Sequence, residues 1–291
     1  MNRFIVASLA VAGLAAAASA QLTAYGVTFD NRLVSFNPAS PGTITGNVAI
    51  AGLDMGESVL GIDARPASLT GALVIVTSNN RLLSLDFDGT ATPIGAGFAP
   101  ALSSPALGMD FNPTVDRVRV INSNGENRRL NPVTGAGVAI DAVMTFSDSG
   151  TTPFIVGAAY NTFQFGVPQP AGSVRQFVVD GIRNILGETG SQAGGNASFN
   201  GGIVTPIGSL GITLTDDTGF DIFGPTQSAF LSVFNVGGAT NFYTVDLGTG
   251  AATLVGAVGD GLGVRDITVI PTPGAFALLS LAGLASLRRR R

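Results

Sequence analysis

The sequence repeats itself with a period of about 47 residues, and this period restricts the possible folds more than any other feature. Each unit begins with a Gly, one apolar residue and, in most copies, an Asp. The glycines of most successive copies are close to one period apart, and the interval from Gly157 to Gly219 is the longest. The copies are Gly61-Ile62-Asp63, Gly108-Met109-Asp110, Gly157-Ala158-Ala159, Gly219-Phe220-Asp221 and the looser Gly263-Val264-Arg265-Asp266.

A second marker follows the same rhythm. It is a short apolar stretch that ends in Asn or Asp just before a turn, and again only the interval that spans the fourth unit is long. The polar ends are Asn37, Asp86, Asn131, Asp180 and Asp246. Two independent markers with a shared spacing indicate a structural repeat, and a unit of this length with four short strands is typical of a β-propeller blade.

Between the markers, the residues have the composition of strands and turns. Residues 72–77 are rich in Val, Ile and Leu, and Ser78-Asn79-Asn80 has turn composition. Residues 81–86 form a second apolar run, so the whole segment predicts a β-hairpin. No window outside the two ends of the chain shows sustained helical periodicity. We therefore predict an all-β chain that folds as a single β-propeller of about five four-stranded blades.

The two ends of the repeat predict how the ring closes. The series starts near Leu22 with a second strand and ends at residues 263–270 with a lone first strand. Pairing residues 264–270 with the sheet of residues 22–60 would complete one blade from both termini and bury two open sheet edges. The fourth unit, from Gly157 to Gly219, is longer than the others and leaves two interpretations. It is a decorated blade or long loop in a five-bladed ring, or two units of a six-bladed ring.

The N-terminal segment, residues 1–20, has the features of a secretory signal peptide. Arg3 precedes an apolar stretch at residues 4–17, and the small residues Ala18 and Ala20 then fit the specificity of signal peptidase. We expect cleavage before Gln21. The alternative is a membrane anchor or a buried helix, but the apolar run is short and ends in a small-residue site.

The C-terminus carries a second processing signature. A Pro-x-Pro segment is followed by an apolar run and a cluster of arginines, and a helix over that run would reach about 20 Å, short of the roughly 30 Å hydrocarbon core. The positive-inside preference would hold the arginines on the cytoplasmic side. The residues are Pro271, Thr272, Pro273 and Gly274, then 275–287, then Arg288, Arg289, Arg290 and Arg291.

This order of elements resembles the PEP-CTERM sorting tail that exosortase-type enzymes process in bacteria, with Thr272 in place of the middle Glu. The resemblance implies an exported protein whose tail touches the membrane transiently and meets an exosortase-like enzyme. The alternative is a C-terminal amphiphile without a sorting role. The chain thus divides into a signal peptide (1–20), a propeller domain (21–270) and a tail (271–291).

Charge and composition exclude several functions. Without Arg3 and the four terminal arginines, ten Arg face 19 acidic residues, a net charge of about −9, which does not attract nucleic acid phosphates. The chain has no His, Cys or Trp, and all 15 of its cations are Arg, so it also has no Lys. Triads that use His, thiolate nucleophiles, Lys Schiff bases and His/Cys zinc sites are therefore excluded. The absence of a composition break favours one domain.

Several segments resemble the domain of unknown function 4394 family, and the similarity runs from about Tyr25 to Ile270. The most specific part is residues 110–132. The resemblance implies a propeller-like β fold on a secreted bacterial protein, with no established activity. The matching residues are Leu60 to Pro66, Gly71, Leu73, Gly108 to Val120, Asn127, Arg128, Leu130 to Pro132, Gly135, Ile207 to Gly211 and Gly219 to Ile222.

The repeated Asp residues are the main chemical lead. The innermost strand of each blade lines the channel of a propeller, so Asp63, Asp110, Asp221 and Asp266 are expected at equivalent levels around the axis. Such carboxylates repel one another unless a hard cation or Arg neutralises them, which makes a channel calcium ion one interpretation. The favoured alternative is structural, with each Asp accepting backbone N–H bonds at its own strand end.

A cluster of charged residues surrounds one predicted hairpin. Its cations could contact an anion or a uronate, but we favour cross-strand ion pairs on a solvated face. The residues are Arg117, Arg119, Arg128 and Arg129, with Asp116 and Glu126.

Two functions from different classes remain. The favoured one is a non-catalytic protein of the cell surface or extracellular matrix whose propeller binds a polysaccharide or an envelope protein. The alternative is a glycoside hydrolase or lyase that uses the pair Asp63 and Asp110 with Tyr160 or Tyr243. The chain has only three Glu, none at a repeated inner position, so we assign no catalytic residue. They are Glu57, Glu126 and Glu188.

Overall fold

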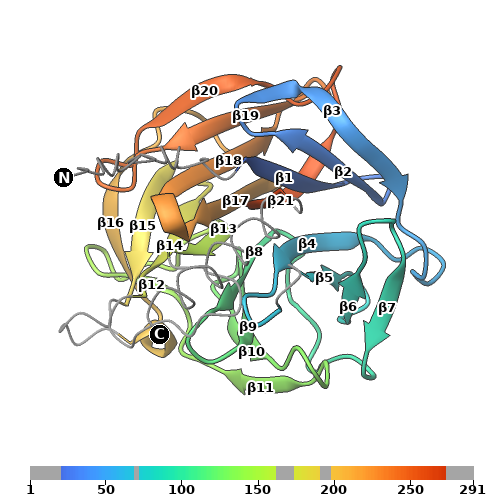
Figure 1. Ribbon diagram of the computed structural model, residues 1–291. Helices are drawn as coiled ribbons and strands as arrows, with labels where there is room; N and C mark the ends of the chain where they lie inside the picture. The colour runs from blue at the N-terminus through green and yellow to red at the C-terminus, as the bar shows by residue number, and fades with distance from the viewer. Residues whose placement is uncertain (1–20, 69–71, 162–173, 191–197, 273–291) are drawn as a thin grey trace, which may run out of the picture.

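The computed structural model describes residues 21–68, 72–161, 174–190 and 198–272. They form five β-sheets arranged as blades around a central channel (Figure 1). The fold is a five-bladed β-propeller, as the repeat predicts. The blades are numbered from the N-terminus, and the strands of each are given from the channel outward.

Blade 1 consists of β21 (Val264–Pro271), β1 (Leu22–Thr28), β2 (Arg32–Asn37) and β3 (Ser40–Ala49). Blade 2 consists of β4 (Val59–Ala64), β5 (Leu73–Thr77), β6 (Leu82–Leu85) and β7 (Ala91–Ile94). Blade 3 consists of β8 (Leu107–Asn112), β9 (Arg117–Asn122), β10 (Asn127–Leu130) and β11 (Gly137–Ile140). Blade 4 consists of β13 (Ile155–Tyr160), β14 (Gln176–Asp180), β15 (Ile185–Thr189), β16 (Ile203–Ser209) and β12 (Thr145–Phe146). Blade 5 consists of β17 (Thr218–Phe223), β18 (Ser228–Phe234), β19 (Thr240–Val245) and β20 (Ala252–Ala257).

Both termini contribute to blade 1, as the sequence predicts. β1 pairs antiparallel with β21 from Leu22 opposite Pro271 to Thr28 opposite Val264. Beyond the last pair, the Thr272 N–H donates to the Gln21 carbonyl oxygen at 2.7 Å. Pro271 and Thr272 are therefore part of the folded blade and extend it beyond the expected domain end at Ile270.

The long fourth unit is one decorated blade. β12, which comes from the segment between blades 3 and 4, pairs parallel with β16 and adds a fifth strand at the outer edge. Two short 3₁₀ helices, η1 (Phe199–Gly201) and η2 (Gly224–Thr226), lie in blades 4 and 5.

Apolar side chains between neighbouring sheets form the core. Between blades 1 and 5, the Phe36 ring meets the Phe242 ring edge-on at 5.2 Å, and the Phe230 ring stacks on Phe242 at 5.6 Å. All three are at least nine-tenths buried. The Phe residues of this boundary serve sheet-to-sheet packing, which a propeller requires wherever two blades meet.

The glycines of the repeated motif let the innermost strands approach each other. A Cβ atom on Gly108 would lie 2.2 Å from the backbone nitrogen of Ala158 in the next blade. A Cβ atom on Gly219 would lie 2.7 Å from the Ile267 nitrogen. Any larger residue would push neighbouring blades apart at the channel, which explains why Gly recurs once per blade at most copies of the motif.

In three blades, an Asn in the turn between the second and third strands, counted from the channel, hydrogen-bonds the segment that follows later in the chain. Asn31, Asn80 and Asn184 have φ of 57°, 59° and 53°, a conformation that Asn tolerates better than most residues. In each turn the backbone carbonyl and the side-chain amide oxygen of the Asn both accept N–H groups from the following segment. The carbonyl oxygens accept those of Ile50, Phe98 and Leu210 at 2.9 Å each, and the Oδ1 atoms accept those of Val59, Leu102 and Leu214 at 2.9, 2.8 and 2.7 Å.

Replacing Asn80 with Ala is expected to lower the free energy of unfolding by about 2 kcal/mol, because Ala resists positive φ and leaves the Leu102 N–H without its acceptor. Asn79→Ala is the matched control, since Asn79 is exposed in the same turn. Chemical denaturation of both variants measures the difference. Equal losses of stability would contradict the role of Asn80.

Candidate functional site

The channel holds the four carboxyl groups that the sequence singles out. Asp63, Asp110, Asp221 and Asp266 lie on the innermost strands β4, β8, β17 and β21, and each is between 6% and 8% exposed. Blade 4 has Ala159 at the corresponding position of its motif. The channel is therefore lined by acidic residues from four of the five blades.

Only three of the four share one cavity. Asp63, Asp110 and Asp221, together with Tyr160 and Thr268, line a space of about 10 Å³. A volume of this size admits about one water molecule. It cannot accept a sugar ring.

Asp266 lies at a different level, which corrects the expected ring of four. Asp63 accepts from Phe111 N–H, one residue after Asp110, but Asp221 accepts from Val269 N–H, three residues after Asp266. Thr268 therefore occupies the Asp position of blade 1, and Asp266 occupies the glycine position. The loose fifth motif, with two residues between Gly and Asp, conceals this shift because sequence spacing does not fix strand register.

Each of these carboxylates joins its own blade to the next one. Asp63 bonds Phe111 N–H at 2.7 Å, and Asp110 bonds Tyr160 N–H at 2.5 Å. The remaining two act in the same way: Asp221 accepts from Val269 N–H at 2.5 Å and Asp266 from Ile62 N–H at 2.8 Å. Three of the four, all except Asp110, also accept the N–H of the residue that follows them: these pairs are Asp63 with Ala64, Asp221 with Ile222 and Asp266 with Ile267.

The boundary from blade 4 to blade 5 has another connection, because Ala159 offers no acceptor. The Gln227 amide donates to the Asn161 carbonyl oxygen at 2.6 Å, and the Asn161 amide donates to Gln227 Oε1 at 3.1 Å. Gln227 has φ of 55° in the turn between β17 and β18. Polar bonds thus bridge all five blade boundaries near the channel.

Burial makes these carboxyl groups weak acids. It raises the pKa of Asp221 to about 7, with a further contribution from the negative charge of Asp63. Burial, the charge of Asp63 and a hydrogen bond between the two carboxyls raise the pKa of Asp110 well above its usual value. Burial also raises the pKa of Asp63, although the hydrogen bond from Asp110 and the N–H groups of Phe111 and Ala64 oppose the rise. Asp63 accepts two backbone N–H groups, whereas Asp110 accepts that of Tyr160, so we expect Asp110 to hold the proton of the pair.

The channel has little in common with a calcium site. Calcium takes about six to eight oxygen ligands, whereas the oxygens of Asp63 and Asp221 already accept backbone N–H groups. Within residues 21–68, 72–161, 174–190 and 198–272, no group of three or more His, Cys, Asp or Glu side chains has the arrangement of a metal site. The calcium ion stays a prediction. Melting curves with calcium and with chelator test it, and identical curves would contradict it.

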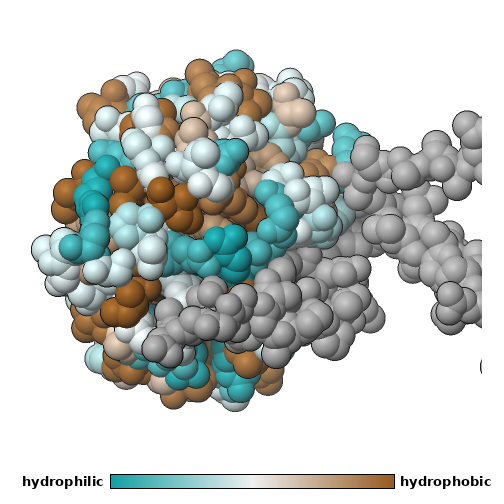
Figure 2. Space-filling view, turned by 90° about the vertical axis from the view of Figure 1, so that its left-hand side faces the viewer, coloured by the Kyte–Doolittle hydropathy of each residue, from teal (hydrophilic) through white to brown (hydrophobic). Residues whose placement is uncertain are grey.

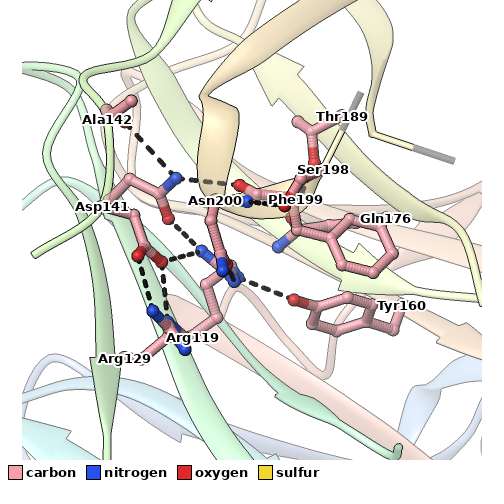
Figure 3. A network of polar contacts seen from close by, with 11 residues as sticks. Arg119, Arg129, Asp141, Ala142, Tyr160, Gln176, Thr189, Ser198, Phe199 and Asn200 are labelled. Carbon is pink, nitrogen blue, oxygen red and sulfur yellow. Dashed lines mark hydrogen bonds and ion pairs between the residues drawn. The ribbon is translucent and has the colours of Figure 1, made fainter. Parts of the chain in front are cut away.

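A second polar network lies between blades 3 and 4 and was not anticipated from the sequence. Arg119, on β9, is 1% exposed, and its guanidinium donates to Tyr160 Oη at 2.7 Å and to Asp141 Oδ2 at 3.0 Å (Figure 3). It also donates to the side-chain oxygens of Asn127 and Asn200. Asp141 in turn pairs with Arg129 at 2.8 Å.

Two of the four arginines near this hairpin therefore do not lie on a solvated face, whereas Arg117 and Arg129 are half-buried. Arg119 and Arg128 are 1% and 3% exposed, and Arg128 pairs with Glu126 at 2.6 Å while donating to backbone carbonyls of residues 100 and 101. Burial follows from the fold, because the faces of β9 and β10 pack against blades 2 and 4. Both guanidinium groups bond partners inside the protein. The Arg119 guanidinium is therefore not free to contact an anion.

The surface offers shallow grooves where blades meet. One of about 190 Å³ is lined by Leu60, Ser78, Asn80 and residues 102–105. Another of about 340 Å³ is lined by Gln21, Leu22, Phe230 and other residues of blades 1 and 5. On the side of the propeller that Figure 2 shows, hydrophobic and hydrophilic residues are interspersed. The grooves are large enough for one residue or one sugar unit of a partner.

The predicted processing sites are only partly within the described residues. Gln21, Pro271 and Thr272 belong to blade 1. In the part of the chain that the structure describes, no helix has the length and apolar character needed to cross a bilayer. The other residues of these predictions lie outside the described ranges: Ala18, Ala20, Pro273, Gly274, Arg288, Arg289, Arg290 and Arg291.

These features define a five-bladed β-propeller whose channel is closed by buried, hydrogen-bonded carboxyl groups. Residues 32–268 match the family described as Domain of unknown function (DUF4394), and the chain belongs to this family. This confirms the resemblance seen in the sequence. No curated protein matches the chain.

Solved structures are similar at low sequence identity. A protein from Lactobacillus plantarum, a structural genomics target, is 15% identical with a TM-score of 0.38, and the alignment covers 84% of this chain and 70% of that one. PorZ, an essential bacterial surface component of the type-IX secretion system of Porphyromonas gingivalis, is 14% identical with a TM-score of 0.36, and the alignment covers 85% of this chain and 32% of that one.

Proposed function

We propose that the protein is exported and acts outside the cell or on its surface as a non-catalytic propeller that binds a polysaccharide or an envelope protein. The observation that carries this proposal is that the repeated carboxyl groups bond neighbouring blades to each other. Asp63, Asp110 and Asp221 are buried, bond the next blade and surround a space of about 10 Å³. They hold the ring together and leave no room for a substrate.

The alternative of a glycoside hydrolase or lyase depends on the same residues. The pair Asp63 and Asp110 has one feature of an acid–base pair, since the pKa of Asp110 is raised by burial and by the charge of Asp63. A glycosidase needs its two carboxyls on either side of a bound sugar. These two instead line one buried space of about 10 Å³ that has no room for a sugar ring, which favours the binding function.

The predicted ends of the chain support an extracellular location. The apolar residues 4–17 followed by Ala18 and Ala20 fit a signal peptide, and the Pro-x-Pro, apolar and Arg tail fits a sorting signal. Signal peptidase and an exosortase-like enzyme are the processing partners of this proposal. The net charge of about −9 in the propeller disfavours nucleic acid as a ligand.

A screen of residues 21–272 against extracellular polysaccharides and envelope fractions tests the proposed function. We expect retention of the protein on one class of polymer without release of reducing ends or unsaturated products. Asp110→Asn is the control, and binding should survive it because Asp110 is buried in the channel and accepts the Tyr160 N–H. Product formation that disappears in Asp110→Asn would instead establish the hydrolase or lyase.

A further inference from the structure

Both ends of the propeller domain meet at one point. Gln21 begins the described chain, and its carbonyl oxygen accepts the N–H and the hydroxyl of Thr272, each at 2.7 Å. The Thr23 and Thr272 hydroxyl oxygens lie 3.0 Å apart. The chain therefore enters and leaves the propeller at the same place, between Gln21 and Thr272.

This point lies on one defined face of the propeller. The innermost strands run in the same direction around the channel, because each Asp bonds the equivalent end of the next strand. We call the face on which they end the strand-end face, and the opposite one the strand-start face. The innermost strands end at Ala64, Asn112, Tyr160, Phe223 and Pro271, so Thr272 lies on the strand-end face.

The connection from this point to the apolar run of the tail is short. Only Pro273 and Gly274 separate Thr272 from the run that begins at Ala275. An extended chain covers at most about 3.6 Å per residue, so the run begins within about 11 Å of Thr272. A propeller held on so short a connection cannot turn freely over a bilayer.

We propose that the strand-end face lies against the lipid bilayer whenever the C-terminal apolar run is inserted, and that the strand-start face is presented to ligands. The inference rests on the proposed export and membrane contact of the tail. The signal peptide joins the propeller at the same point, so a precursor with both segments inserted keeps the same face toward the membrane. The arrangement also places the groove of Leu60, Ser78 and Asn80 on the presented face.

The presented groove has a polar lining suited to a hydroxyl-rich polymer. Ser78, Asn80, Ser103 and Ser104 supply hydroxyl and amide groups at its wall. The larger groove at Gln21, Leu22 and Phe230 lies instead beside the junction of both tails, on the side that faces lipid.

Because the chain has no Cys, a single Cys introduced by substitution can be labelled specifically. Val115→Cys places a label in the turn between β8 and β9 on the strand-end face, and Val236→Cys places one between β18 and β19 on the strand-start face. The two valines are 51% and 100% exposed, so both positions accept a fluorophore. Each labelled full chain is bound to vesicles that carry nitroxide-labelled lipid head groups. We expect quenching at position 115 and none at position 236.

The possible outcomes distinguish a wrong orientation of the propeller from a wrong assignment of membrane contact. Equal quenching at both positions, or stronger quenching at position 236, overturns the proposed orientation while leaving the tail as a membrane anchor. If the full chain does not bind vesicles at all, the membrane contact in the proposed function is wrong, and the orientation fails with it. A chain ending at Thr272 should not bind, and melting curves of both Cys variants check that the fold is kept.

Discussion

Replacing Arg119 with Met is expected to lower the free energy of unfolding by about 4 kcal/mol, because a buried ion pair loses one partner. The side chains of Arg119 and Asp141 are 2% and 6% exposed. The substitution also removes the donors to the side-chain oxygens of Tyr160, Asn127 and Asn200. Urea denaturation at neutral pH measures the loss.

Arg117→Met is the matched control for this prediction. Arg117 lies two residues earlier on the same strand, is half-buried, and donates to the carbonyl oxygens of Val115 and Asp116. Its replacement should cost less than about 1 kcal/mol, as is usual for surface changes. A loss at Arg119 no larger than the loss at Arg117 would show that the network does not hold blades 3 and 4 together.

The second large effect is expected with pH: the protein should be more stable at pH 5 than at pH 8. A carboxyl whose pKa is higher in the folded chain than in the unfolded chain binds its proton more tightly when folded. Its stabilisation is complete below the unfolded pKa, about 3.9 for Asp, and is lost as the pH rises through the folded pKa. For Asp221 the folded pKa is about 7, and the pKa values of Asp110 and Asp266 are also raised by burial.

The composition makes this pH effect easy to isolate. The chain has no His and no Cys, so the side chains that usually titrate between pH 5 and 8 are absent. The midpoint of urea denaturation should therefore fall steadily from pH 5 to pH 8. A flat profile, or one that rises with pH, would contradict the raised pKa values in the channel.

Asp110→Asn tests which group holds the proton. The Asn amide can donate to Asp63 as the protonated Asp110 does, and its oxygen can still accept the Tyr160 N–H. We expect a shallower pH dependence and higher stability at pH 8 than in the unsubstituted protein. Asp63→Asn should be harmful at every pH, because its NH₂ group would face either the Phe111 N–H or the Ala64 N–H, which bond different oxygens of Asp63. An unchanged pH profile in Asp110→Asn would place the proton elsewhere.

Much of the fold follows from the repeat. The spacing of the Gly-apolar-Asp motif predicts five blades, and the unpaired units at both ends predict that β21 pairs with β1. The count of five succeeds because blades 2, 3 and 5 are local units whose strands are joined by short connections. The pairing of β21 with β1 is not local, and its prediction succeeds because closing the ring leaves neither of these two sheet edges open. The sequence left open whether the long fourth unit forms one blade or two. The structure shows one blade, to which β12 adds an outer strand by pairing with β16.

The site was predicted less completely. The sequence identifies Asp63, Asp110 and Asp221 as channel residues, but it misplaces Asp266 by one level because the register of β21 depends on its partners in blades 2 and 5. The Asn residues that fasten the turns had a usable signal. Asn31-Arg32-Leu33 and Asn80-Arg81-Leu82 repeat the same three residue types at the blade period.

The sequence alone determines the period, the closed ring and the scarcity of reactive groups, because these depend on local residue patterns and on composition. The tertiary structure alone decides which polar groups become partners. Arg119 meets Asn200 across 81 residues, and Asp221 meets Val269 across 48. Such contacts depend on how far each blade is rotated and shifted against its neighbour, and close packing between whole sheets sets that geometry. The sequence repeat therefore identifies the Asp residues, but only the packing of neighbouring blades shows that they bond one blade to the next.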